Sequence, residues 1–266
     1  MMAVLLFSCS SQRNLAIQFV TQQAQLHVLL LPPPAVIRKF YPAHPDSLKP
    51  AQVDPFNLSE SQFIKHANDS VLINLFMDAL RENLALFGVK AYEASEIEKF
   101  LALDSLAYVF SVAQLEAMEY NDKDLKYTLY DTTVYEIAFP QVILTQSQWF
   151  EFTELNHPER PMQVLYSSQF TNDVFQGRFR KNTLTGQMAY EYQSFPLGFA
   201  DLYQLSVFAG QKNAQYIYDF LLNKYIDDRL KKTRRPKDYL QYQRELNTLG
   251  RAYNDRFIRI AIPDSE

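Results

Sequence analysis

The middle of the chain, from Lys126 to Tyr192, constrains the fold more than any other part. Aromatic and β-branched residues alternate there with polar residues and turn formers, which is typical of short antiparallel strands. We expect a meander followed by a half-exposed hairpin, with Gly177 and Gly186 flanking the hairpin. The expected strands are 127–130, 134–139, 142–144, 149–152 and 163–166, and the expected hairpin is 179–192.

A regular apolar stripe precedes this region. Leu and Phe residues recur at helical spacing between positions 72 and 87, with Asp69 or Ser70 as the cap and Gly88 where a left-handed C-cap is needed. A capping box at Ser95 opens a second helix. The expected order is helix 69–87, strand 89–92, helix 95–103 and strand 108–120.

The two ends of the chain complete the prediction. Apolar residues alternate in part between 15 and 31, which favours two short strands, and the polar, Pro-rich stretch 38–65 indicates a long surface excursion. Helical spacing returns over 202–228 and from Pro236 to Ile258, where a Tyr-rich stripe predicts a second helix. The sequence therefore predicts an α+β fold, with a mixed, largely antiparallel sheet, two helices in the N-terminal half and a C-terminal helical pair.

Composition and motifs argue against several function classes. The chain has 266 residues, 47% of them hydrophobic, and a net charge of -4, so it folds and does not bind nucleic acid through overall basicity. Its four histidines are scattered, and six glycines leave little room for a nucleotide loop. We therefore expect no enzymatic activity, no catalytic residue, no metal site and no cofactor.

Charge is unevenly distributed along the chain. Between Arg229 and Arg259 there are ten Lys or Arg and three Asp or Glu, a local +7, which leaves -11 for the remainder. Six of these cations, without an acid between them, form what we call the basic segment, 229–237. The candidate residues for binding a partner or an anionic surface are Arg229, Lys231, Lys232, Arg234, Arg235, Lys237, Arg244 and Arg251.

Three interpretations of the basic segment remain open. It can be a solvated loop that neutralises the adjacent pair Asp227 and Asp228. It can instead bind anionic lipid headgroups or an acidic partner, with each cation contributing on the order of 1 kcal/mol near a membrane surface. A nucleic acid is the third candidate, and only for a chain that stays in the cytoplasm.

The N-terminus carries a further signal. An apolar run ends in Leu6-Phe7-Ser8-Cys9, which resembles the lipobox of bacterial lipoproteins. The resemblance implies cleavage before Cys9 and acylation of its thiol, with the polar residues that follow acting as a tether. The expected organisation is a signal over 1–8, a tether over 9–14, an α+β domain over 15–198, and a helical pair over 199–260 that packs on the same domain.

The lipobox and the helix-strand block 69–120 together resemble a Bacteroidota-type outer-membrane lipoprotein, and the block is similar to the small α/β domains of auxiliary lipoproteins in envelope transport and assembly machines. The likeness implies a lipid-anchored accessory subunit that faces the periplasm and binds an envelope protein, with its oligomeric state left open. One alternative is a glycan- or ligand-binding lipoprotein at the periplasm or cell surface, with Trp149, Phe150, Tyr190 and Tyr192 as an aromatic platform. Another is a cytoplasmic nucleic-acid-associated protein that uses 229–237.

Overall fold

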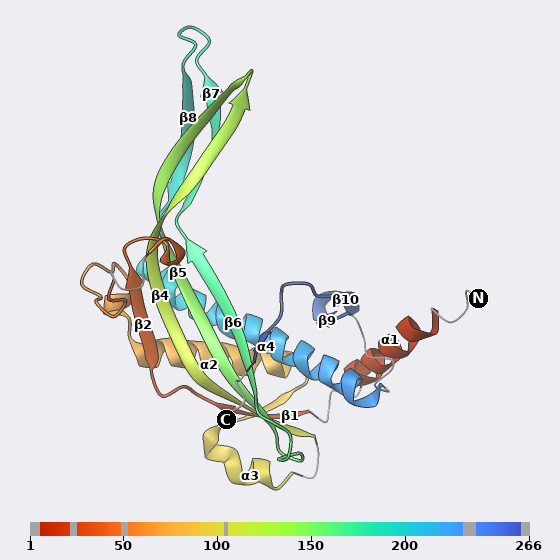
Figure 1. Ribbon diagram of the computed structural model, residues 1–266. Helices are drawn as coiled ribbons and strands as arrows, with labels where there is room; N and C mark the ends of the chain where they lie inside the picture. The colour runs from red at the N-terminus through yellow and green to blue at the C-terminus, as the bar shows by residue number, and fades with distance from the viewer. Residues whose placement is uncertain (1–5, 22–25, 49–52, 104–105, 231–237, 262–266) are drawn as a thin grey trace.

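The structure is a computed structural model that describes residues 6–21, 26–48, 53–103, 106–230 and 238–261. A mixed sheet of seven strands is covered on one face by two long helices, and an arm of β-strands projects from the sheet (Figure 1). The chain is thus an α+β protein with a mixed, mostly antiparallel sheet, as predicted.

The sheet has the order β11-β6-β5-β4-β1-β3, and β2 pairs with β4 farther along the same edge as β1. Pairing is parallel among β1, β2, β3 and β4 and antiparallel among β4, β5, β6 and β11. The strands are β1 (His27–Leu31), β2 (Val36–Tyr41), β3 (Lys90–Tyr92), β4 (Ala107–Tyr130), β5 (Thr133–Glu154), β6 (Gln163–Asn172) and β11 (Ile258–Ile260).

Helices α2 (Asp69–Leu86) and α4 (Phe199–Arg229) cover one face of this sheet. The Asn68 side chain caps α2 by accepting a hydrogen bond from the Val71 amide, and Gly88 follows the helix with a φ of 73°. Helices α2 and α4 pack closely at Gly210, where an added Cβ would lie 2.4 Å from the Phe76 carbonyl oxygen. A glycine is therefore required for this helix contact. The remaining short helices are α3 (Ile97–Leu101), η2 (Pro45–Ser47), η4 (Ile64–His66) and η5 (Ala94–Glu96).

The N-terminal segment differs from the prediction. Residues 6–21 form helix α1 (Leu6–Thr21), so the strand expected near residue 15 is wrong, and residues 9–14, expected as a tether, lie within this helix. Gln12, Ala16 and Phe19 are buried, at spacings of four and three. The alternating Leu and Ile residues suggested a strand. The segment is helical instead, because α1 can pack its apolar residues at helical spacing against α4.

The expected second C-terminal helix is also wrong. Residues after 238 form β9 (Leu240–Gln243), the short helix η7 (Arg244–Leu246) and β10 (Thr248–Arg251), with Asn247 in the left-handed region at a φ of 47°. The Asn223 side chain of α4 pairs with both backbone groups of Leu240, at 2.9 Å and 2.7 Å. These bonds hold the backbone as an extended strand, which overrides the helical spacing of the tyrosines.

The arm is a third difference. The short strands expected between 108 and 152 merge into two long ones, β4 and β5, whose outer halves leave the body of the protein (Figure 1). A separate hairpin, β7 (Val174–Lys181) and β8 (Met188–Phe195), lies along them and confirms the predicted hairpin. We define the arm as residues 122–141 together with 174–195. The excursion expected from residue 38 includes β2, which the sequence did not reveal.

Candidate functional site

The N-terminal helix packs on the end of α4, and we call this contact the α1–α4 junction. The Phe19 ring lies 5.4 Å from the Tyr218 ring and 5.3 Å from the Tyr225 ring, measured between centroids. The Gln12 side chain is buried and its Nε2 donates a hydrogen bond to the Asp238 carbonyl oxygen at 3.0 Å. Asp238 directly follows the basic segment in the sequence, so the structure brings Gln12 into contact with the residue after that segment.

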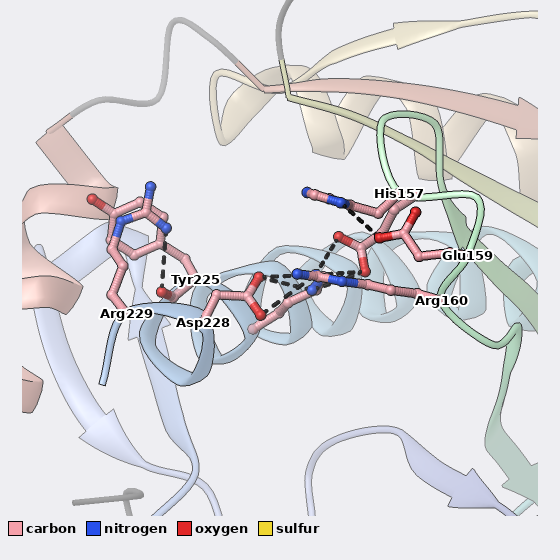
Figure 2. A network of polar contacts seen from close by, with 8 residues as sticks. His157, Glu159, Arg160, Tyr225, Asp228 and Arg229 are labelled. Carbon is pink, nitrogen blue, oxygen red and sulfur yellow. Dashed lines mark hydrogen bonds and ion pairs between the residues drawn. The ribbon is translucent and has the colours of Figure 1, made fainter. Parts of the chain in front are cut away.

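Arg229, the first cation of the basic segment, ends α4. Its guanidinium carbon lies 3.5 Å from the centroid of the Tyr225 ring, a cation–π contact, and its Nη1 donates to the Tyr225 carbonyl oxygen at 3.4 Å (Figure 2). A cation at this position also complements the negative end of the helix dipole. Lys231, Lys232, Arg234, Arg235 and Lys237 lie outside the described residues, and Cys9 lies in α1 near its start.

An ion-pair network lies one turn before Arg229. The Lys224 ammonium contacts Glu154 and Asp228, both at 2.9 Å, and Arg160 contacts the same two carboxylates at 2.9 Å and 3.3 Å (Figure 2). Glu154 and Lys224 are nearly buried, with side chains 7% and 10% exposed. The network fastens the loop between β5 and β6 to α4.

The charges of the network shift the pKa values of Asp228 and of the nearby Tyr108. Burial alone would raise the pKa of Asp228, but the hydrogen bond and charge of Lys224, together with Arg160, outweigh it and hold that pKa below its ordinary value. Burial and the nearby Glu154 and Asp228 carboxylates raise the pKa of Tyr108 to about 12. Asp228 thus has two cationic partners outside the basic segment, and the interpretation of this segment as a solvated loop that neutralises Asp227 and Asp228 stays a prediction.

The last two predicted cations lie at different contacts. Arg251 forms an ion pair with Asp238 at 3.2 Å, which places it beside the α1–α4 junction. Arg244 lines a pocket of about 350 Å³ between the end of α2, α4 and η7, with its guanidinium carbon 6.0 Å from the Phe87 ring centroid. Phe87 stacks on Tyr218 at 4.7 Å, so Arg244 is linked to the junction through two aromatic rings.

The structure does not assemble the aromatic platform that the glycan-binding hypothesis requires. Phe150 is fully buried in the core, and Trp149, its neighbour on β5, contacts Tyr166 on the opposite face of the sheet. Tyr190 and Tyr192 belong to β8, where they pack against Phe139 inside the arm. These four side chains therefore belong to three different packing contacts and do not form one aromatic surface that could bind a glycan.

The arm carries an exposed apolar surface that sequence reasoning missed. Along the outer half of β4, every second residue faces outward, and Leu125, Tyr127 and Leu129 are 53%, 77% and 68% exposed. The polar residues between them, Asp124 and Lys126 among others, are half-buried on the side facing the second hairpin. This is the reverse of the usual alternation. The period of two could have been detected in the sequence, because apolar residues occupy 125, 127 and 129.

Comparison with known proteins adds no relative: no protein-family model and no curated protein matches this chain. Within the described ranges, no group of three or more His, Cys, Asp or Glu side chains could hold a metal ion. No helix there is both long and apolar enough to cross a membrane. The α1–α4 junction and the arm are the two surfaces from which a function can be argued.

Proposed function

We propose that this chain is a non-enzymatic, lipid-anchored accessory subunit of a cell-envelope complex, attached through Cys9 to the periplasmic side of the outer membrane. One observation carries the proposal: the hydrogen bond between Gln12 and Asp238. Gln12 lies three residues after Cys9, and Asp238 is the residue after Lys237. A described residue close in sequence to the candidate anchor is therefore in contact with the residue that follows the basic segment.

Such an arrangement suits attachment to an anionic membrane surface. Lipid chains on Cys9 would supply hydrophobic attachment, and six neighbouring cations would add an electrostatic term of on the order of 1 kcal/mol each near anionic headgroups. Because α1 begins before Cys9 and one face of it is buried from Gln12 onward, through Gln12, Ala16 and Phe19, little free chain separates anchor and domain. The domain would be held close to the bilayer.

The position of the arm supports an accessory role. Helix α4 has 31 residues, so it is about 46 Å long. It runs from the base of the arm to the α1–α4 junction (Figure 1). A protein anchored at the junction would present the arm at a distance from its attachment point, where an envelope partner can reach it.

Radiolabelled palmitate tests the anchor. The native host would express the wild type from its genomic context beside Cys9→Ser, and label is expected in the wild type alone. Label in neither protein would overturn the anchoring and return the basic segment to the cytoplasm, with nucleic acid as its leading ligand. Equal label in both would place the lipid elsewhere and overturn the role of Cys9.

Vesicle binding tests the basic segment. In the chain with Cys9→Ser, which cannot carry the lipid, charge reversal to Glu at Lys231, Lys232, Arg234 and Arg235 should abolish sedimentation with phosphatidylglycerol vesicles. The matched control reverses four cations of the arm, Lys126, Arg178, Arg180 and Lys181, and should leave binding unchanged. Binding of the protein to neutral phosphatidylcholine vesicles should be the same with and without either set of charge reversals. Undiminished binding after reversal of the basic segment would remove the role proposed for it.

A further inference from the structure

The outer half of β4 is an open strand edge. From Ala107 to Ser111 this edge of β4 pairs with β1, and from Leu115 to Tyr120 it pairs with β2. Beyond Tyr120, among the described residues, β4 pairs with β5 alone. The hairpin β7–β8 packs on the face of β4–β5 and forms its own two-stranded sheet. Backbone groups along 122–130 are thus available to another strand, and natural proteins normally block such an edge.

The outward row on this edge is symmetric about Tyr127. It reads Lys123, Leu125, Tyr127, Leu129, and Asp131 follows at the turn. In an antiparallel pair of identical strands centred on Tyr127, every facing pair lies at equal distances before and after that residue. Leu125 then faces Leu129 of the second copy, and Lys123 lies opposite the turn that carries Asp131, whose backbone is left-handed with a φ of 58°. The row is complementary to itself in both charge and apolar character.

We propose that a second copy of this chain docks on this edge, with the two β4 strands pairing antiparallel about a two-fold axis at Tyr127. The contact is isologous and joins the two β4–β5 ribbons into one four-stranded sheet. It adds main-chain hydrogen bonds, two Leu–Leu pairs and a Tyr–Tyr pair, and at each end it brings Lys123 opposite the turn that carries Asp131. The self-complementary charges favour a copy of this chain over an unrelated strand.

Edge lysines usually oppose strand addition, but both of those present here are compensated. Lys123 lies opposite the turn that carries Asp131 of the second copy, as described above. Lys126 points to the other side of the strand, where its Nζ already contacts Asp124 within the same chain at 2.8 Å. The arm as a whole has five cations and five acids, so two arms approach without net repulsion. The edge is therefore open to a second arm.

Disulfide trapping tests the pairing. Facing residues of antiparallel strands have Cβ atoms about 5 Å apart, so Tyr127→Cys should form a covalent dimer under mild oxidation. Glu136→Cys is the matched control, because Glu136 is the exposed partner of Tyr127 on β5, on the same face. Its two copies would be three strand spacings apart, about 14 Å, and should not link.

The register has its own test. A mixture of Leu125→Cys and Leu129→Cys proteins should give a mixed dimer, whereas either variant alone should give little. Dimer yields that are equal at 127 and 136, or absent at 127, would overturn the pairing. A dimer at 127 without the mixed 125–129 product would overturn the register.

These experiments are independent of the lipid anchor. All cysteine variants are first made in the full chain with Cys9→Ser. They are then made in the native host with Cys9 intact, where the chain whose one cysteine is Cys9 gives the background level of covalent dimer. Loss of palmitate label with persistence of the Tyr127→Cys dimer would refute the anchor and keep the arm contact. The opposite result would keep the anchor and refute the contact.

Discussion

The two halves of the β4–β5 hairpin show opposite relations between sequence and burial. In the body, Phe110, Phe150 and Phe152 lie under the helices and are almost fully buried. The pairing of the two strands shifts once, at a bulge between Val112 and Gln114, and then keeps one register through the arm to the pair Tyr130 and Thr133. In the arm, the apolar residues of β4 face solvent. Continuous hydrogen bonding between strands therefore extends well beyond the core, and the arm must depend on other contacts.

A polar seam lies within the body, in the part nearer to the arm. Gln146 and Gln148 of β5 are buried against α4, where Gln146 accepts a hydrogen bond from Ser206 at 2.6 Å and Gln148 from Asn213 at 3.2 Å. Beyond this seam the arm has a small apolar centre of its own. Phe139 stacks on Phe175 at 4.7 Å and contacts the tyrosines of β8. The arm thus folds as a separate layer with few aromatic contacts, and it should respond differently to substitution.

The largest difference is expected from truncation of one aromatic residue in each half. Phe150→Ala should lower the free energy of unfolding by about 3 to 5 kcal/mol, because the ring is fully buried against Phe76, Phe110 and Phe257. Tyr127→Ala should change it by less than about 0.5 kcal/mol in the monomer. Urea unfolding measures both. A similar loss from both variants would show that the arm and the body unfold as one packed unit.

Ion pairs provide the next comparison. Glu154→Ala should cost about 3 kcal/mol, because it leaves the nearly buried Lys224 without one of its two carboxylates. In the arm, Glu191 pairs with Arg180 at 2.9 Å, but both side chains are more than half exposed. Glu191→Ala should therefore cost at most about 1 kcal/mol. Chemical denaturation with an unchanged m-value tests this, and a larger loss at Glu191 would contradict it.

Sequence periodicity predicted the elements whose partners are local. The apolar stripe of α2, the helix α4 and the hairpin β7–β8 follow from spacing and turn residues alone. The expected cap of α2 was wrong by one or two residues, since Asn68 caps the helix and not Asp69 or Ser70. Periodicity failed for segments whose secondary structure depends on a side chain that is distant in the sequence. Residues 15–19 alternate like a strand, but Phe19 packs on two tyrosines of α4, and only the helical period allows this contact.

The site was predictable only in part, for the same reason. Clustering of Lys and Arg identified Arg229 and the basic segment, since charge runs are visible in one dimension. The contact of Gln12 with Asp238 spans 226 positions and involves common residue types, so no local pattern indicates it. The C-terminal strand β9 likewise depends on Asn223 and Asp219 of α4, whose role appears only in three dimensions.

Asp219 gives the body a pH dependence. Burial raises its pKa from 3.8 to about 8, although hydrogen bonds from the Tyr242 amide and Gln215 oppose the shift. The folded chain therefore keeps a proton between about pH 4 and about pH 8 that the unfolded chain loses. Stability from this group is complete below about pH 4 and decreases as pH rises towards about 8, by at most about 1.4 kcal/mol per pH unit. Asp219→Asn should remove this slope; an identical slope in wild type and variant, from urea unfolding at a series of pH values, would refute the assignment.

Gly210 in the body and Gly177 in the arm both leave no room for a Cβ, so Gly→Ala substitutions test steric contact in each region. In the body, Gly210→Ala places a Cβ against the α2 backbone and should cost about 1 to 3 kcal/mol. Gly250→Ala is the control, because nothing lies within 4 Å of the position of its added Cβ. Thermal unfolding should show a clear loss for the first variant and almost none for the second. Equal losses would mean that glycine flexibility, and not helix contact, sets the cost.

In the arm, Gly177→Ala should produce the smallest change in global stability. Its Cβ would lie 2.2 Å from the Glu191 carbonyl oxygen and 2.8 Å from the Tyr192 Cα, so β7 must move away from β8 at this pair. Because this hairpin forms its own sheet, global unfolding should change by less than about 0.5 kcal/mol, while amides of 174–195 exchange faster with solvent. Hydrogen exchange that accelerates equally in β4 and β6 would show that a change in the arm reaches the body, and the inferred separation of arm and body would then be wrong.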